Sequence, residues 1–353
     1  IRAAQLGLKA AIVERDALGG ICLNWGCIPT KALLHSAEVY ETMQHAAEYG
    51  LKVEKASFDA EAIVKRSRDV AAQLSGGVTF LMKKNKIDVI EGTGSLVGAG
   101  KIVVKDKAGK TREVGAKNVI LATGARARVI EGLEPDGKTV WTYREAMVPK
   151  AIPKSLIVIG SGAIGIEFAS FYRAFGAEVT VVEVLDRILP VEDEEISKEA
   201  ARVFKKRGIR ILTGAKIDKT DISDKGATIA VSVNGKSETL EAEKVVSAVG
   251  IVGNVENLGL EKAGVKVEKT HVVVNEWLET GVKGIYAIGD LAGPPWLAHK
   301  ASHEGVIAVE RIAGVKGLHP MNVNRIPGCT YSSPQIASVG LTEAKAKEKG
   351  HEV

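Results

Sequence analysis

The sequence predicts an α/β fold built on parallel sheets and divided into two similar halves. Segments typical of strands and of helices alternate along most of the chain, which is the pattern of a parallel sheet covered by helices. An apolar strand at residues 157–159 runs into the glycine-rich turn 160–165 and then into a helix. A strand, a helix and a strand ending in glutamate occur in both halves, with the glutamates at Glu14 and Glu183. These observations favour two Rossmann-like dinucleotide-binding domains with three-layer parallel-sheet cores.

The first half begins with short elements. Residues 1–7 have the pattern of the end of a helix, and residues 8–15 have that of the strand after it. We therefore expect a strand, a glycine turn and part of a helix to precede them in the parent protein. Two long amphipathic helices and several short strands are predicted next. The helices are 30–49 and 59–84, and the strands are 87–92, 101–105, 111–114 and 119–124.

The second half begins after a predicted linker at residues 149–153. Its first strand, 155–160, leads into G-x-G-x-x-G and a helix over 164–175. In this context the first glycine forms the turn, the second lets a pyrophosphate approach the backbone, and the third packs helix on strand. The next strand, 178–182, ends at Glu183, about twenty residues further on. A carboxylate there accepts hydrogen bonds from both ribose hydroxyls and repels a 2′-phosphate, which favours NAD over NADP.

The remaining elements are shorter. We predict a buried strand at 284–290 that ends in an acid, Asp290, and a helix at 299–312, and a new element begins near residue 322. Before them lie the predicted strands 210–212, 227–233 and 244–249.

The composition is that of a globular protein and argues against several classes of function. Hydrophobic residues make up 45% and charged residues 26% of the 353 positions, and a net charge of +5 is small for this length. The sequence has no basic run with interleaved aromatic residues, so we expect no nucleic-acid partner. No apolar segment reaches about 18 residues without charges, so we expect no membrane span.

Two of the three cysteines, Cys22 and Cys27, lie close together in the glycine-flanked segment 19–31. Three cysteines argue against a disulfide scaffold, and in a reducing compartment a close pair is typical of a catalytic or metal site. Zinc needs about four ligands, and no second Cys/His pair has the spacing to supply them, so no metal is expected. The pair can instead cycle between dithiol and disulfide. Because a nicotinamide passes hydride and a disulfide takes two electrons, flavin is the natural carrier between them.

The segment Cys-Leu-Asn-x-Gly-Cys-Ile-Pro-Thr-Lys resembles the redox-active disulfide motif of the flavin-dependent pyridine nucleotide–disulfide oxidoreductases. Within this family it is most similar to members that oxidise dihydrolipoamide with NAD. The resemblance therefore implies FAD and NAD as cofactors, a homodimer in the complete parent, and a lipoyl domain of a 2-oxoacid dehydrogenase complex as the partner. It covers essentially the whole chain and is strongest at residues 19–34, 157–183, 284–305 and 326–342.

The resemblance also implies how the chain is divided. Residues 326–331 and Pro334-Gln335 are similar to the start of the family's dimer-interface domain, and Cys329 within them is expected to be an ordinary buried cysteine. The implied compartment is the bacterial cytoplasm or the mitochondrial matrix. The expected parts are an FAD-binding domain at 1–145, an NAD-binding domain at 146–270, a return to the FAD domain at 271–320, and the beginning of an α+β dimerisation domain at 321–353.

Cofactor-binding residues follow from the resemblance, position by position. Glu14 is expected at the ribose of the FAD adenosine, and Asp290 at the ribityl chain. The expected FAD residues are Glu14, Lys31, Gly94, Thr123, Gly124, Ala125, Asp290, Trp296, Leu297, Ala298 and His299. The expected NAD residues are Gly160, Ser161, Gly162, Ala163, Ile164, Gly165, Glu167, Glu183, Ile217 and Gly250.

Four residues are expected to carry the chemistry. The resemblance implies that Cys22 is the outer sulfur attacked by the dithiol substrate and that Cys27 is the inner sulfur beside the flavin. Lys31 and Glu167 are expected to form an ion pair near the reactive edge of the flavin. The family takes its general base from a His-x-x-x-x-Glu motif near the C-terminus of the other subunit, and the end of this sequence does not carry that motif. We therefore expect impaired lipoamide turnover by this chain alone.

Two alternatives stay open. Glutathione and mercuric reductases share the cysteine spacing but prefer NADP, and Leu23, Ile28 and Glu183 favour the lipoamide branch over them. The other alternative is an inactive fragment or a scaffold, which the intact cysteine pair argues against. Thiol reactivity before and after NADH separates the two, because a scaffold would show no NADH-dependent change.

Overall fold

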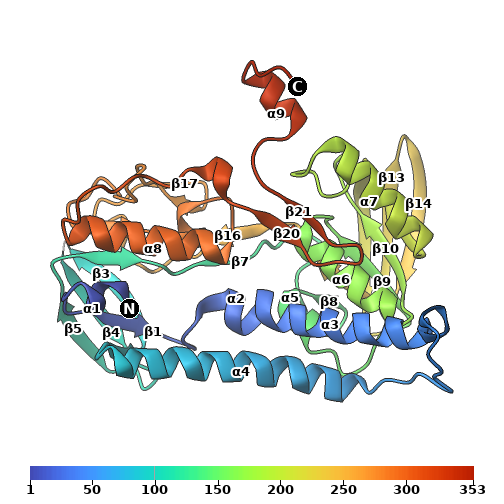
Figure 1. Cartoon of the computed structure of the whole chain (residues 1–353), viewed down its shortest axis with the longest axis horizontal. Helices are drawn as coiled ribbons and strands as arrows, with labels where there is room; N and C mark the ends of the chain where they lie inside the picture. The colour runs from blue at the N-terminus through green and yellow to red at the C-terminus, as the bar shows by residue number, and fades with distance from the viewer. Residues whose placement is uncertain (99) are drawn as a thin grey trace. The chain divides into compact units, whose positions relative to one another are not determined.

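The computed structural model describes residues 1–98 and 100–353, which form two compact units (Figure 1). Both contain helices and parallel strand pairs, so the predicted α/β fold class is confirmed. The four-part division expected from the sequence stays a prediction. Unit 1 comprises residues 1–24, 72–126 and 251–323, and unit 2 comprises residues 25–71, 127–250 and 324–353.

A five-stranded parallel sheet, in the order β11-β10-β9-β15-β8, forms the centre of unit 2. Alternate residues of β9 enter different cores, with Val158 on the side of the helices and Ile157 on the opposite side. Burial on both faces explains why these strands are continuous apolar runs. The strands are β8 (Val140–Trp141), β9 (Ser155–Ile159), β10 (Glu178–Val182), β11 (Ile209–Leu212) and β15 (Lys244–Ser247).

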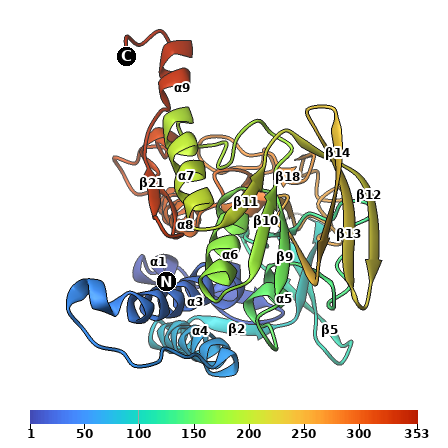
Figure 2. The same cartoon turned by 90° about the vertical axis from the view of Figure 1, so that its right-hand side faces the viewer.

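Helices cover one face of this sheet and an antiparallel layer covers the other (Figure 2). The predicted strand 227–233 belongs to this antiparallel layer, in which Ile229 and Val231 are fully buried. The helices are α3 (Cys27–Gln44), α5 (Tyr143–Met147), α6 (Ala163–Ala174) and α7 (Glu194–Lys206). The antiparallel strands are β12 (Ala215–Ser223), β13 (Gly226–Val233) and β14 (Lys236–Ala242). Unit 2 also contains η1 (Ala46–Tyr49), β20 (Gly328–Thr330), β21 (Ile336–Ser338) and α9 (Glu343–Glu348).

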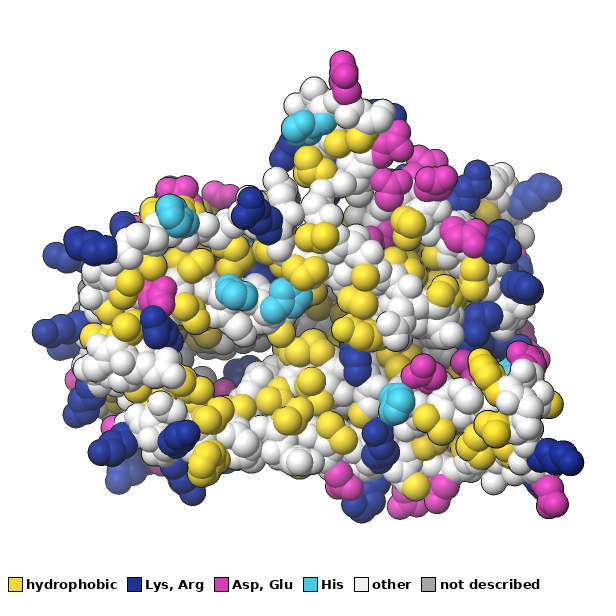
Figure 3. Space-filling view, in the orientation of Figure 1, with side chains coloured by type: hydrophobic (Ala, Val, Ile, Leu, Met, Phe, Trp, Pro, Cys, Tyr) yellow, Lys and Arg dark blue, Asp and Glu magenta, His cyan; other side chains and the backbone are white. Residues whose placement is uncertain are grey.

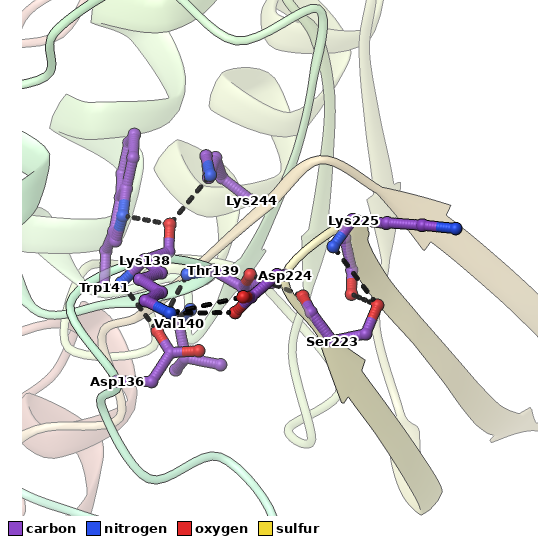
Figure 4. Close-up of polar contacts among 10 residues, drawn as sticks. Asp136, Lys138, Thr139, Val140, Trp141, Ser223, Asp224, Lys225 and Lys244 are labelled. Carbon is purple, nitrogen blue, oxygen red and sulfur yellow. Dashed lines mark hydrogen bonds and ion pairs between the residues drawn. The ribbon is translucent and has the colours of Figure 1, made fainter.

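A group of polar contacts fixes the edge strand β8 (Figure 4). The Asp136 carboxylate accepts hydrogen bonds from the backbone N–H groups of Lys138, Thr139 and Val140 at 2.7–2.8 Å. The Thr139 hydroxyl donates to the carbonyl of Ser223 at the end of β12, at 2.7 Å. The loop before β8 is therefore tied to the antiparallel layer as well as to the sheet.

Unit 1 contains smaller sheets. These sheets include two parallel pairs, β1-β2 and β6-β19, and the antiparallel three-stranded sheet β3-β4-β5. The strands are β1 (Ala11–Glu14), β2 (Asp88–Glu91), β3 (Thr93–Gly98), β4 (Lys101–Lys105), β5 (Thr111–Gly115), β6 (Val119–Leu121), β7 (Ala125–Ala127), β16 (Ile251–Gly253), β17 (Val267–Glu268), β18 (His271–Val272) and β19 (Ile285–Ala287). The helices are α1 (Arg2–Gln5), α2 (Gly20–Trp25), the second half of α4 (Ala60–Lys84), η2 (Gly289–Ala292) and α8 (Ala298–Ile312). The last residue of unit 1, Val323, is the first residue of η3 (Val323–Arg325).

Several predicted elements have other bounds in the structure. The strands expected at 119–124 and 244–249 end at Leu121 and Ser247. The strand expected at 284–290 ends at Ala287, and Asp290 lies in η2, because Gly289 adopts a φ of +71° that ends the strand. The helix expected at 30–49 begins at Cys27 and ends at Gln44, and a short 3₁₀ turn follows it.

Within the described part of the chain, no helix is long and apolar enough to cross a bilayer. On the face shown in Figure 3, acidic and basic side chains both occur, with apolar side chains between them.

Candidate redox and cofactor sites

The two cysteines of the pair belong to two helices that follow each other along the chain. Cys22 belongs to α2, Cys27 is the first residue of α3, and the two are joined by a disulfide. The Asn24 side chain is buried and donates to the carbonyls of Leu18 and Gly20 at 3.0 and 2.9 Å, which holds the segment around Cys22. The structure thus contains the oxidised form of a dithiol that can be reduced.

Lys31 and Glu167 form an ion pair in unit 2. The Lys31 ammonium lies 2.7 and 2.8 Å from the two carboxylate oxygens of Glu167, which is almost completely buried on α6. The backbone N–H of Tyr331 donates to the same carboxylate at 2.9 Å. The structure therefore brings together two residues that the sequence analysis expected to pair, and adds a third that it did not name. Their role in catalysis stays a prediction.

The glycine-rich turn has the geometry that its sequence requires. A Cβ at Gly160 would lie 2.4 Å from the Ala248 carbonyl oxygen, and one at Gly165 would lie 2.0 Å from the Gly160 carbonyl oxygen, so both positions exclude a side chain. A Cβ at Gly162 would meet nothing within 4 Å. An open side at Gly162 beside the first amides of a helix is what pyrophosphate binding requires, and the role of this turn in binding NAD stays a prediction.

Glu183 follows β10 beside this turn and is 7% exposed. One of its oxygens accepts both the N–H and the hydroxyl of Ser161, at 2.9 and 2.6 Å, and the other accepts the N–H of Leu185 at 2.9 Å. A carboxylate offers about four acceptor positions, so capacity is left for a ribose hydroxyl.

The other expected NAD residues occupy several elements of unit 2. Ala163 and Ile164 begin α6, and Ile164 is 41% exposed. Ile217 lies in β12 and is half-buried against the core beneath the antiparallel layer. Gly250 follows β15 with a φ of +101°, and its carbonyl accepts the N–H of Arg128.

In unit 1, Glu14 ends β1 and Gly94 lies in β3. The Glu14 side chain accepts the N–H of Asp16 at 2.8 Å. A Cβ at Gly94 would lie 3.2 Å from the Val13 side chain, so this side chain packs against the backbone of β3. The expected roles of Glu14 and Gly94 in binding FAD stay predictions.

The Thr123-Gly124 turn is held by a loop distant in sequence. The Thr123 hydroxyl donates to the Asn254 carbonyl at 2.8 Å, and the Asn254 side chain donates back to the Thr123 carbonyl at 2.9 Å. Gly124 has a φ of +68°, and Ala125 after it is buried. This reciprocal pair fixes the turn that the sequence analysis placed over FAD, and Asn254 was not foreseen.

Asp290 lies beside a buried ion pair. The Lys300 ammonium lies 2.8 Å from Glu304, and each is about 5% exposed. Glu304 also accepts the N–H of Gly289 at 2.7 Å, and Lys300 donates to the Gly293 carbonyl at 2.9 Å. Burial raises the pKa of Asp290; Lys300 lowers it, and Glu304 raises it further. The Lys300–Glu304 pair was missed, although its i,i+4 spacing after Asp290 is visible in the sequence.

Trp296 stacks on a histidine. Its indole N–H points to the Nε2 of His271 at 3.3 Å, and the ring planes differ by 21°. Burial lowers the pKa of His271, Asp290 raises it and Lys300 lowers it, which favours the neutral imidazole that can accept this hydrogen bond. Leu297 precedes α8, and Ala298 and His299 begin it.

Cys329, expected to be buried, is half-buried and is not in a disulfide. The charge of its thiolate, and then its hydrogen bond with the hydroxyl, raise the pKa of Tyr331. His299 and Glu304 have the spacing of the family's general-base motif, but the Glu304 carboxylate is already bound by Lys300.

The chain belongs to the pyridine nucleotide–disulphide oxidoreductase family, whose model matches residues 1–305. The model of the dimerisation domain of the same family matches residues 326–353. The resemblance seen in the sequence is therefore confirmed, and so are FAD and NAD, the cofactors of this family.

Within this family, the two relatives described next are both named dihydrolipoyl dehydrogenase. A dihydrolipoyl dehydrogenase from Rhizobium etli is 55% identical over 369 residues, covering 100% of this chain and 77% of its own length. One from Zymomonas mobilis is 53% identical, covering 100% of this chain and 76% of its own length.

Two solved structures have a fold similar to that of this chain. LpdA from Mycobacterium tuberculosis superposes with a TM-score of 0.91 at 28% identity, over 99% of this chain and 77% of its own. The Cu(II) complex of the HOCl-induced flavoprotein disulfide reductase RclA from Escherichia coli superposes with a TM-score of 0.85 at 25% identity, over 99% of this chain and 76% of its own.

Proposed function

We propose that the chain catalyses the dihydrolipoyl dehydrogenase reaction, the oxidation of dihydrolipoamide to lipoamide with reduction of NAD. The observation that carries this proposal is the Cys22–Cys27 disulfide, in a chain up to 55% identical to enzymes of that name. Glu183 supports NAD rather than NADP, because a carboxylate repels a 2′-phosphate. This preference separates the chain from a glutathione or mercuric reductase.

The disulfide supports a thiol–disulfide exchange with dihydrolipoamide. One thiolate of dihydrolipoamide attacks Cys22, the bond between the two sulfurs breaks, and Cys27 leaves as a thiolate. The second substrate thiol then attacks the mixed disulfide, which releases cyclic lipoamide and leaves both cysteines reduced. FAD, held by the residues named below, would supply the two-electron chemistry that connects the reduced cysteine pair to NAD. Lys31, one helical turn after Cys27, places a positive charge near the inner sulfur and favours its thiolate.

Each cofactor has a set of residues that would hold it. Glu14, Gly94, Thr123, Gly124 and Asp290 would bind FAD, with Ala125 and the segment 296–299 alongside. The turn 160–165 would bind the pyrophosphate of NAD, Glu183 its ribose, and Glu167, Ile217 and Gly250 would lie near the remainder.

The proposal extends to assembly. The match to a dimerisation domain supports a homodimer of the complete protein, and the names of the relatives support a role in a 2-oxoacid dehydrogenase complex. A lipoyl domain would carry the substrate to Cys22. The bacterial cytoplasm or the mitochondrial matrix is the compartment in which such a complex works.

The test compares two activities of the protein with FAD added. Cys22→Ser and Cys27→Ser should each abolish dihydrolipoamide oxidation while leaving NADH-dependent reduction of a dye, because the dye does not need the disulfide. Full dihydrolipoamide oxidation by Cys22→Ser would refute the proposed mechanism. Unchanged thiol accessibility after anaerobic NADH would favour the scaffold alternative instead.

A further inference from the structure

Residues 326–353, which match the dimerisation domain, are here called the dimerisation segment, and their first strand, β20, packs on α6, the helix that carries Glu167. The Tyr331 N–H donates to the Glu167 carboxylate at 2.9 Å, and the Ser333 N–H donates to the Ser170 hydroxyl at 3.1 Å. The segment at 331–333 is therefore attached to α6 at two positions one turn apart.

Tyr331 contacts both members of the Lys31–Glu167 pair. Its backbone binds the carboxylate, while its ring lies beneath the Lys31 ammonium, with Nζ 4.9 Å from the ring centroid. The Lys31 side chain is 32% exposed, so water competes for the ammonium, whereas Glu167 is only 6% exposed. The aromatic ring restricts where the exposed end of the pair can move.

Lys31 follows Cys27 by four positions in α3. Residues four apart on a helix have Cβ atoms about 5–6 Å from each other, so the two residues lie one turn apart on one face of the helix. A cation near a thiol favours the thiolate, and the thiolate is the reactive form. The position of the Lys31 ammonium therefore influences the reactivity of Cys27.

We propose that Tyr331 is a positioning residue for the redox pair, which holds the Lys31 ammonium near Cys27 through its ring while its backbone holds Glu167. The dimerisation segment thus acts on the redox site through its own subunit. This inference rests on the proposed function only in taking Cys27 as a reacting thiol.

The test measures alkylation of Cys27 by iodoacetamide in the Cys22→Ser background, where Cys27 stays a thiol. Mass spectrometry separates the modified Cys27 from Cys329, and the rate is followed from pH 5 to pH 9. Tyr331→Leu should slow alkylation at neutral pH by about two- to fivefold and move its half-maximal rate to higher pH. Tyr331→Phe, which keeps the ring and loses only the hydroxyl contact with Cys329, should restore the rate.

A second measurement distinguishes positioning from a general effect on folding. In a Lys31→Met background, Tyr331→Leu should have no further effect on Cys27, since the ammonium is gone. An equal effect of Tyr331→Leu in both backgrounds, or a rate unchanged by Tyr331→Leu, would overturn the proposal. If Tyr331→Leu fails to fold, Tyr331→Met provides the same comparison. The measurement needs neither lipoamide nor NAD, so failure of the proposed function would be seen separately, as a loss of turnover with this dependence intact.

Discussion

Ser161 donates both its backbone N–H and its hydroxyl to a single oxygen of Glu183, at 2.9 and 2.6 Å. The glycine-rich turn and the acidic end of the next strand are therefore connected by the protein itself. The other oxygen of Glu183 accepts the N–H of Leu185, so both carboxylate oxygens are held in place.

Replacement of this carboxylate should change nucleotide preference. Glu183→Gln keeps the shape and removes the charge, so NAD should bind about tenfold more weakly and the preference over NADP should shrink. Titrations of both nucleotides give the ratio of their dissociation constants. Ser161→Ala is the matched control, since it removes one hydrogen bond to Glu183 but no charge. An unchanged ratio in Glu183→Gln would show that Glu183 does not face the ribose.

Two glycines of the same turn should separate folding from binding. A Cβ at Gly165 would lie 2.0 Å from the Gly160 carbonyl oxygen, so Gly165→Ala should lower the melting temperature. A Cβ at Gly162 meets nothing and its φ is −67°, so Gly162→Ala should leave the melting temperature unchanged and weaken NAD binding. Thermal unfolding and NAD titration of the two variants test this. Normal NAD binding by Gly162→Ala would place the pyrophosphate elsewhere.

The buried pair in α8 should be intolerant of single changes. Glu304→Ala leaves the Lys300 ammonium buried without its partner and should destabilise the protein by about 3–5 kcal/mol. The double variant Lys300→Met/Glu304→Leu should be more stable than Glu304→Ala, because no charge is left buried. Denaturant unfolding of the three proteins gives the comparison. A double variant no more stable than the single one would contradict this account.

Asp290 and Asp136 should respond to pH in opposite directions. Burial raises the pKa of Asp290, with Lys300 opposing and Glu304 adding to the shift. A raised pKa means that the folded state holds the proton more tightly than the unfolded state. The contribution of Asp290 to stability is then complete below its unfolded pKa of about 3.9 and is lost as the pH rises through the folded pKa. Asp290→Asn should therefore gain stability relative to the parent on going from pH 4 to pH 7, in the absence of FAD.

For Asp136, burial opposes ionisation, but hydrogen bonds from the N–H groups of Lys138, Val140 and Thr139 lower its pKa overall. Its contribution is present above the unfolded pKa and is lost as the pH falls through the folded value. Asp136→Asn should thus lose stability relative to the parent at pH 7 and approach it near pH 3. Melting temperatures of both variants across this range test the pair, and parallel pH profiles would rule the assignment out.

The sequence predicted those features that depend on neighbours along the chain. The strand 178–182 and the strand 101–105 have the predicted bounds, because each is a short apolar run between turn residues. The Cys22–Cys27 disulfide was implied by the resemblance of the segment 19–31 to a redox-active disulfide motif, and both residues lie in that one segment. Local periodicity and motif spacing are sufficient for such elements.

Contacts between distant segments were not predictable from the local pattern, and the Lys31–Glu167 pair was expected only through the family resemblance. The Tyr331 N–H donates to the Glu167 carboxylate, 164 positions away, and the Thr123 hydroxyl donates to the Asn254 carbonyl, 131 positions away. Nothing in the local pattern around Tyr331 or Asn254 distinguishes them from other loop residues. The antiparallel strands β12 and β14 were missed because alternating polar and apolar residues in a hairpin give a weaker signal than a buried run.

The pairing of β8 has a consequence for how unit 2 can be made. In the described structure, Val140 and Trp141 are bonded within the sheet to β15 alone, through Val245 and Val246. A growing chain therefore exposes this edge strand until residue 247 has been synthesised, and a shorter polypeptide would leave two buried apolar side chains without their neighbour. Any expression fragment intended to bind NAD must extend past Ser247, even though every residue of the glycine-rich turn is complete long before it.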